Sequence, residues 1–144
     1  MLKSQAMTDW AAAHKDLLAG KSNSEVLQYI SPTAINFYAV IIHKLNATWW
    51  PEDKESRNKG EMIALMHSEL SEALEAVRKD SMDSHLPTRK GVEVEMADTI
   101  IRIFDFCSAF NLDLGGAIVE KLRYNLDRAD HKLESRAAPG GKKF

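Results

Sequence analysis

The stretch 60–79 constrains the fold of this chain most, because it combines helical periodicity with acids on its apolar side. At about 100° per residue its apolar residues share one broad arc, and Glu69 and Glu72 lie inside that arc or at its edge. An ionised carboxylate that faces a core is costly unless positive charge compensates it. The stretch therefore predicts a core-facing helix whose acids bind a cation or form strong ion pairs.

The remainder of the chain also has helical periodicity. No apolar alternation is long enough for a strand, and there is no internal repeat. Pro32 suits the first position of one helix, Gly20 stops another, and Ser24 is expected to cap a brief turn. Helices are predicted over 8–19, 32–48, 61–79, 92–110 and 114–131. The sequence thus predicts an all-α bundle of four to five helices in a single domain, 1–144, with a helical extension over 1–30 and a flexible tail over 137–144.

Composition limits the class of protein. The chain has 144 residues, 44% of them hydrophobic, which suits one domain with its own core. Its single cysteine, Cys107, excludes an intrachain disulfide and fits a reducing compartment. The net charge of −2 argues against a nucleic-acid partner, and no run approaches the roughly 20 apolar residues of a membrane helix. The start also lacks a signal-peptide pattern, so we expect a soluble, cytoplasmic protein with no nucleic-acid or membrane partner.

The predicted helix over 92–110 carries a second acid pair, Glu95 and Asp98. Apolar residues cover more than half of its circumference and leave a narrow charged strip that continues through Arg102 and Asp105. This pattern is typical of a helix buried on nearly all sides, which a small bundle could hardly cover alone. We therefore expect an oligomer, and we expect Arg102 either to reach a phosphate or to pair with Asp98 or Asp105.

Two antiparallel helices that each present carboxylates one turn apart can gather four acids around one point. Acids three residues apart occur six times in this chain, so only the apolar position of 69/72 and 95/98 distinguishes them. Ion pairs with arginine or lysine would satisfy these acids, and so would a bound cation. An all-oxygen ligand set favours Mg²⁺, with Mn²⁺ as a substitute, and hence phosphate chemistry. The rival di-iron bundle would need Glu-x-x-His, which the sequence lacks.

The pattern Glu69-x-x-Glu72, a 22-residue gap and Glu95-x-x-Asp98 resembles the MazG-like nucleoside triphosphate pyrophosphohydrolases. The resemblance runs from about Trp49 to the C-terminus, includes RNKGEMIALMHSELSEALEA and HLPTRKGVEVEMAD, and is to the compact single-domain branch common in phages and bacteria. It implies hydrolysis of an NTP or dNTP to the monophosphate and pyrophosphate by a helical homodimer or homotetramer. The implied location is the cytoplasm, or the host cytoplasm for a phage protein.

The resemblance also implies residue roles. Mg²⁺ would be held by the four acids Glu69, Glu72, Glu95 and Asp98. Lys121 and Asn125, one turn apart on the last helix, would contact the triphosphate, with Arg128 beside them. The other interpretation of Lys121 and Arg128 is an ordinary solvated helix face.

The general base is less directly implied. Many relatives carry an acid immediately before the first ligand, and this chain has Ser68 there. Because a water bound to a metal has a lowered pKa, a ligand carboxylate can serve as the base. We therefore expect Glu72 or Glu69 to act, ahead of His67.

Nucleobase recognition is expected before the first acidic helix. Trp49 and Trp50 could stack on a base, while His43 and Asn46 could hydrogen-bond its edge. The alternative is that one tryptophan is core and the other lies at a subunit contact. At the level of function, the alternative is a non-catalytic nucleotide-binding or helical interaction protein that retains the fold.

Overall fold

The structure, a computed structural model, describes residue 15 and residues 17–128, and these confirm the predicted all-α class. Within that described part there is no strand, only an isolated bridge between Met82 and Lys90. The chain divides into two compact units. One is Pro32–Gly115, and the other is formed by the segments on either side of it.

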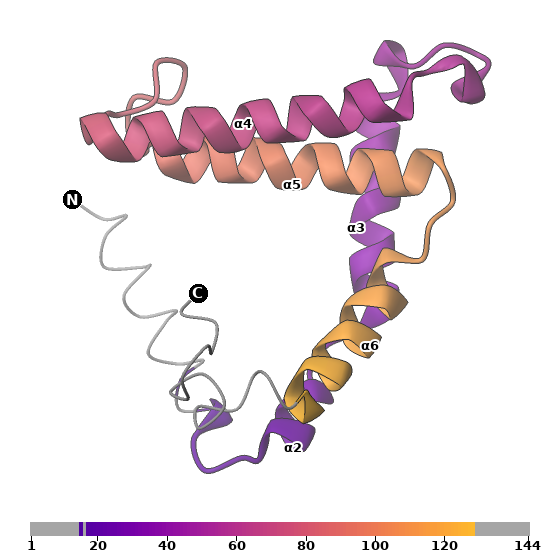
Figure 1. Ribbon diagram of the computed structural model, residues 1–144, viewed down its shortest axis with the longest axis vertical. Helices are drawn as coiled ribbons and strands as arrows, with labels where there is room; N and C mark the ends of the chain where they lie inside the picture. The colour runs from indigo at the N-terminus through magenta and orange to yellow at the C-terminus, as the bar shows by residue number, and fades with distance from the viewer. Residues whose placement is uncertain (1–14, 16, 129–144) are drawn as a thin grey trace, which may run out of the picture. The chain divides into compact units, whose positions relative to one another are not determined.

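The centre of the Pro32–Gly115 unit is an antiparallel pair of long helices, α4 (Lys59–Lys79) and α5 (Gly91–Ala109), which lie side by side along their length (Figure 1). Asn58 begins α4, because its side chain accepts hydrogen bonds from the amides of Gly60 and Glu61. Gly91 begins α5 close to α4: a Cβ there would lie 2.9 Å from the Ala76 Cβ. The helices can therefore approach closely where the 80–90 connection returns the chain.

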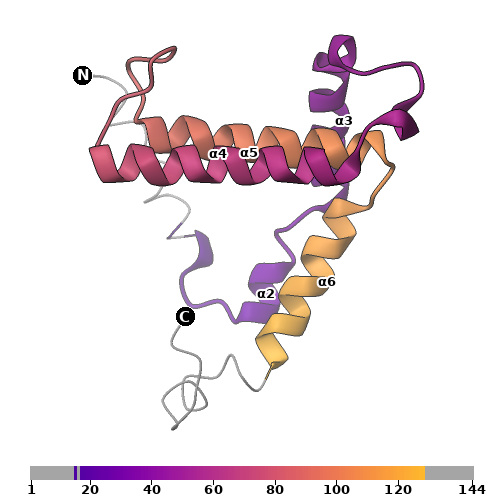
Figure 2. The same cartoon turned by 45° about the horizontal axis from the view of Figure 1, so that its top comes forward.

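Helix α3 (Pro32–Leu45) packs on α5 and crosses the α4–α5 pair steeply (Figure 2). Asn36 ties the start of α3 to the end of the unit, since it donates to Asp113 and accepts from the Gly115 amide. A Cβ on Gly115 would overlap the backbone of Pro32, so glycine permits this contact. After α3, two short 3₁₀ helices, η1 (Ala47–Trp49) and η2 (Lys54–Ser56), lead into α4.

The second unit contains α2 (Asn23–Leu27) and most of α6 (Leu114–Asp127). The prediction that Ser24 caps α2 is wrong: Ser22 is the cap, because it forms a reciprocal capping box with Glu25. Gly20 has φ +74° at the end of the preceding helical residues, as expected of a helix stop. Three predicted features lie outside the described residues: the start of the first helix at residue 8, the end of the last helix at residue 131, and the tail over 137–144.

The expectation that α5 is buried on nearly all sides is wrong for the single chain. Met96 and Ile100 are 49% and 51% exposed, because α5 packs on α4 and α3 and leaves another side open. Cys107 lies on the covered side and is buried, and this burial raises the pKa of its thiol. Among the described residues, no helix combines the length and apolar character needed to cross a membrane.

Candidate functional site

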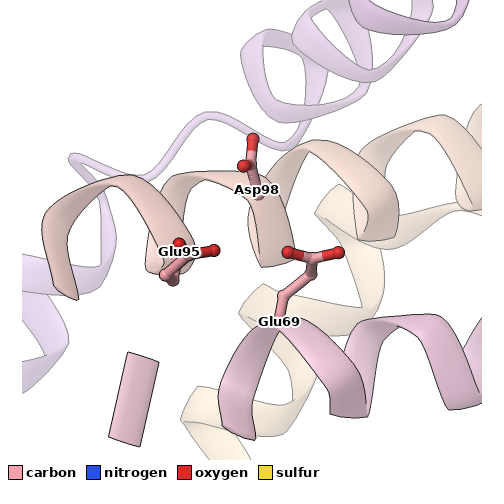
Figure 3. Close-up of side chains that lie close together, drawn as sticks. All are labelled: Glu69, Glu95 and Asp98. Carbon is pink, nitrogen blue, oxygen red and sulfur yellow. The ribbon is translucent and has the colours of Figure 1, made fainter. Parts of the chain in front are cut away.

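Three of the four predicted metal ligands meet between α4 and α5. Figure 3 shows Glu69 on α4 facing Glu95 and Asp98 on α5. One carboxylate oxygen from each residue lies within 4.8 Å of those from the other two. The i,i+3 spacing on α5 places Glu95 and Asp98 on the same face, and the antiparallel packing brings Glu69 opposite them. We call these three residues the acidic cluster.

The acidic cluster gathers negative charge in a partly desolvated place. Glu69 is only 8% exposed. Burial, followed by repulsion from Glu72, Glu69, Asp98 and Asp83, raises the pKa of the Glu95 carboxyl. The folded chain therefore resists the fully ionised form of this cluster, which a bound cation would stabilise.

Arg102 supplies positive charge at the edge of the acidic cluster. Its Nε and Nη2 both lie 2.7 Å from Oε1 of Glu69. The expected partner of an Arg102 ion pair was Asp98 or Asp105, and the structure places the pair on α4 instead, because Glu69 faces Arg102 across the helix interface. The ion-pair interpretation is thus confirmed for Glu69, and the cation interpretation stays a prediction.

Glu72, the fourth predicted ligand, lies one turn beyond Glu69 and is exposed. Its Oε1 accepts a hydrogen bond from Ser68 Oγ at 3.4 Å. Glu72 is not among the three clustered residues of the described chain, but its charge contributes to the raised pKa of Glu95. Its role as a fourth ligand stays a prediction.

A cleft of about 460 Å³ adjoins the acidic cluster. Its lining is polar near the cluster and aromatic at Trp49 and Trp50. Trp49, at its aromatic side, is 76% exposed, and Asp98 belongs to both the cleft and the cluster. The cleft is lined by Asn46, Trp49, Trp50, Arg57, Met62, Leu65, Met66, Asp98, Ile101, Arg102 and Asp105.

Asp105, which also lines this cleft, is the centre of a hydrogen-bond network. His43 Nδ1 lies 2.7 Å from its Oδ1, Asn46 Nδ2 donates to its Oδ2 at 3.2 Å, and Trp50 Nε1 lies 3.1 Å from both oxygens. Lys54 Nζ lies 2.7 Å from His43 Nε2. Because a carboxylate only accepts, His43 donates through Nδ1 and its Nε2 accepts from Lys54. We call these five residues the Asp105 network.

The sequence analysis identified three members of the Asp105 network, His43, Asn46 and Trp50, but missed the residue that joins them. Helical spacing gives no signal for these three residues, because α3 ends at Leu45 and both Asn46 and Trp50 lie beyond it. Their convergence depends on the position of Asp105 on the neighbouring helix α5, which the sequence does not supply.

Two predicted triphosphate contacts, Lys121 and Asn125, lie on α6 in the second unit, and Arg128 follows the last residue of α6. Lys121 Nζ and the Arg128 guanidinium lie 4.7 and 5.7 Å from the ring centre of Tyr124. The Asn125 Oδ1 atom is buried without a hydrogen-bond partner among the described residues. Two cations therefore lie close to the Tyr124 ring.

No protein-family model matches this chain, and the searches of curated proteins and of solved structures also give no match. The ligand atoms that the acidic cluster offers can still be compared with the preferences of metal ions. Glu69, Glu95 and Asp98 offer carboxylate oxygens alone, which suits the hard cations Mg²⁺ and Mn²⁺. Their separation and the raised pKa of Glu95 fit one such ion.

Proposed function

We propose that this protein is a Mg²⁺-dependent nucleoside triphosphate pyrophosphohydrolase of the MazG-like type, with Mn²⁺ as a possible substitute. One observation carries the proposal: Asp98 belongs both to a cluster of three carboxylates and to a cleft large enough for part of a nucleotide. In the reaction, one water is consumed and the anhydride between the α and β phosphates is broken. The products are a nucleoside monophosphate and pyrophosphate.

The acids have distinct roles in this proposal. Glu69, Glu95 and Asp98 would hold the cation, with Glu72 as the fourth ligand. A cation held there would supply charge neutralisation for the phosphates and acidify a water molecule. Glu72 is the better candidate for the general base, because the Arg102 guanidinium already occupies Oε1 of Glu69.

The cleft accounts for the nucleoside part of the substrate. Trp49 offers an exposed ring for stacking on a base. Trp50 and Asn46 line the same cleft, and Asp105 fixes both of them, with His43 supporting Asp105 from outside. Base recognition therefore combines one free ring with an oriented polar wall.

The phosphate part requires further positive charge. Arg102 lines the cleft beside Asp98 and can face a phosphate. The resemblance to the MazG-like family also assigns Lys121, Asn125 and Arg128 to the triphosphate. The exposed apolar residues Met96 and Ile100 of α5 support assembly into a homodimer or homotetramer. The proposed location, the cytoplasm, rests on the family resemblance.

The test is pyrophosphate release from eight common NTPs and dNTPs, measured with Mg²⁺ and with Mn²⁺. We expect turnover of at least one, reduced by a factor of 10³ or more in Asp98→Asn, on the scale of losing a principal charge-stabilising group. Glu75→Gln is the matched control, since Glu75 pairs with Lys79 on the exposed side of α4. Absence of turnover on the whole panel with both metals would sink the enzyme proposal.

The second candidate is a protein that binds nucleotides without turnover. Ser68 favours it, because many MazG-like proteins carry at this position an acid that is sometimes assigned as the base, and this chain has a serine there. Calorimetry with a non-hydrolysable triphosphate and Mg²⁺ separates the two candidates. Binding without pyrophosphate release from the matching substrate would establish the second.

A further inference from the structure

The contact between Arg102 and Glu69 has an unusual geometry for an arginine–carboxylate pair. Two guanidinium nitrogens, Nε and Nη2, address the same oxygen, Oε1, each at 2.7 Å. In the common fork arrangement they would contact both oxygens. Nε donates a hydrogen bond to Oε1 and Nη2 lies against the same oxygen, so the guanidinium covers Oε1. Glu69 can therefore offer a cation only its other oxygen.

The charge at the acidic cluster gives a second, independent observation. Three carboxylates and the Arg102 guanidinium leave a formal charge of −2, which one divalent cation balances. Without Arg102 the same three acids would carry −3, one negative charge more than a single divalent cation balances. A second divalent ion would then be favoured rather than opposed.

We propose that Arg102 limits the acidic site to a single divalent cation. This inference rests on the proposed metal site. Two-metal sites hold their ions about 3.5–4 Å apart, and at this spacing ligand carboxylates commonly bridge both ions. Glu69 is the only member of the cluster from α4, so it is the natural bridge, and Arg102 fills the oxygen that would bind the second ion.

Arg102 also supplies what the second ion would have supplied. Its side chain is 42% exposed and lines the cleft next to Asp98. A guanidinium can stabilise charge on a phosphate group in place of a metal. Arg102 is therefore a positioning residue for Glu69 and a fixed positive charge beside the single ion.

The experiment counts Mn²⁺ ions bound to the full chain, by calorimetry and by electron paramagnetic resonance at saturating Mn²⁺. For the wild-type chain we expect one ion per chain and the spectrum of isolated Mn²⁺. In Arg102→Gln we expect two ions per chain and the exchange-coupled spectrum of a close pair. Arg57→Gln is the matched control, because Arg57 lines the same cleft but lies over the Trp50 ring, and its ion count should stay at one.

Each outcome decides. A coupled pair in the wild-type chain, or a single ion in a folded Arg102→Gln variant, overturns the role of Arg102. No Mn²⁺ binding by the wild-type chain overturns the metal site itself. If Arg102→Gln does not fold by circular dichroism, Arg102→Lys serves instead, because its ammonium keeps the positive charge but cannot place two planar nitrogens on Oε1. One bound ion in this variant supports the charge argument, and two bound ions support the covered oxygen. The wild-type spectrum still tests the proposal.

Discussion

The acidic cluster and the Asp105 network both depend on acids from α5, but the protein satisfies these acids in opposite ways. Asp105 accepts hydrogen bonds from three side chains, and its own side chain is 14% exposed. In the cluster only Glu69 pairs with an arginine, and repulsion contributes to the raised pKa of Glu95. The network is complete within the chain, whereas the cluster carries excess negative charge.

This difference separates an acid that maintains the fold from acids that, in our proposal, bind a cation. A satisfied buried carboxylate is costly to remove, because its donors are then left without partners. A carboxylate held among like charges costs stability by being ionised, so its neutralisation is favourable. Substitutions at the two places should therefore change stability in opposite directions.

The largest expected effect is at the network. Asp105→Ala leaves His43, Asn46 and Trp50 without their acceptor and should lower the free energy of unfolding by about 3 kcal/mol. For a chain of this size, that corresponds to a fall in Tm of roughly 6–12 °C. Denaturant unfolding and calorimetry measure it, provided that the transition is two-state.

Two variants check the reason for this loss. Asp105→Asn keeps an acceptor of similar shape and should cost less than Asp105→Ala. Glu75→Ala removes an exposed acid with a helical i,i+4 partner and should cost no more than about 0.5 kcal/mol. If Asp105→Ala costs as little as Glu75→Ala, the network does not maintain the fold and the contrast with the cluster fails.

A smaller effect of opposite sign is expected at Glu95. Its pKa is raised in the folded chain, so this residue favours folding below the ordinary glutamate pKa of about 4.3 and loses that contribution as pH rises through the folded value. Glu95→Gln should therefore raise Tm by about 1–3 °C at pH 7 without divalent cations, and the gain should disappear near pH 3.5. Thermal unfolding at both pH values measures the difference between the two chains.

Divalent cations sharpen the same comparison. Added Mg²⁺ should stabilise the wild-type chain more than Glu95→Gln, because the variant has lost a charged ligand. A gain in Tm that is equally large at pH 3.5 would mean that glutamine merely packs better, and would contradict the electrostatic account of the cluster.

The helices could be predicted from sequence because their signals are local. Apolar periodicity located α4 and α5, and the acids on their apolar sides located Glu69, Glu95 and Asp98. The partners of Arg102 and Asp105 could not be predicted in this way. They depend on which residues of α4 and α3 face α5, and the spacing within one helix carries no information about the rotation of its neighbour.

The Ser22 cap and the open side of α5 show two further limits. Ser22 and Ser24 both precede helical residues, and only Ser22 has an acid three positions later, which a stricter use of the capping-box rule would have found. The apolar circumference of α5 predicted burial, but periodicity records which residues favour burial and not whether one chain supplies the cover.

The smallest effect on stability is expected at Glu72, and it decides whether this acid belongs with the cluster. Glu72 is exposed and accepts one long hydrogen bond from Ser68, so Glu72→Gln should change the free energy of unfolding by less than about 0.5 kcal/mol without metal. If Glu72 is the fourth ligand, the same variant should weaken Mn²⁺ binding about tenfold or more, on the scale seen when a metal site loses a supporting group.

Ser68→Ala, which removes only the hydroxyl, is the control and should leave Mn²⁺ affinity within about twofold. Unchanged affinity in Glu72→Gln would restrict the ligands to Glu69, Glu95 and Asp98, and Glu72 would then act on the cluster only through its charge.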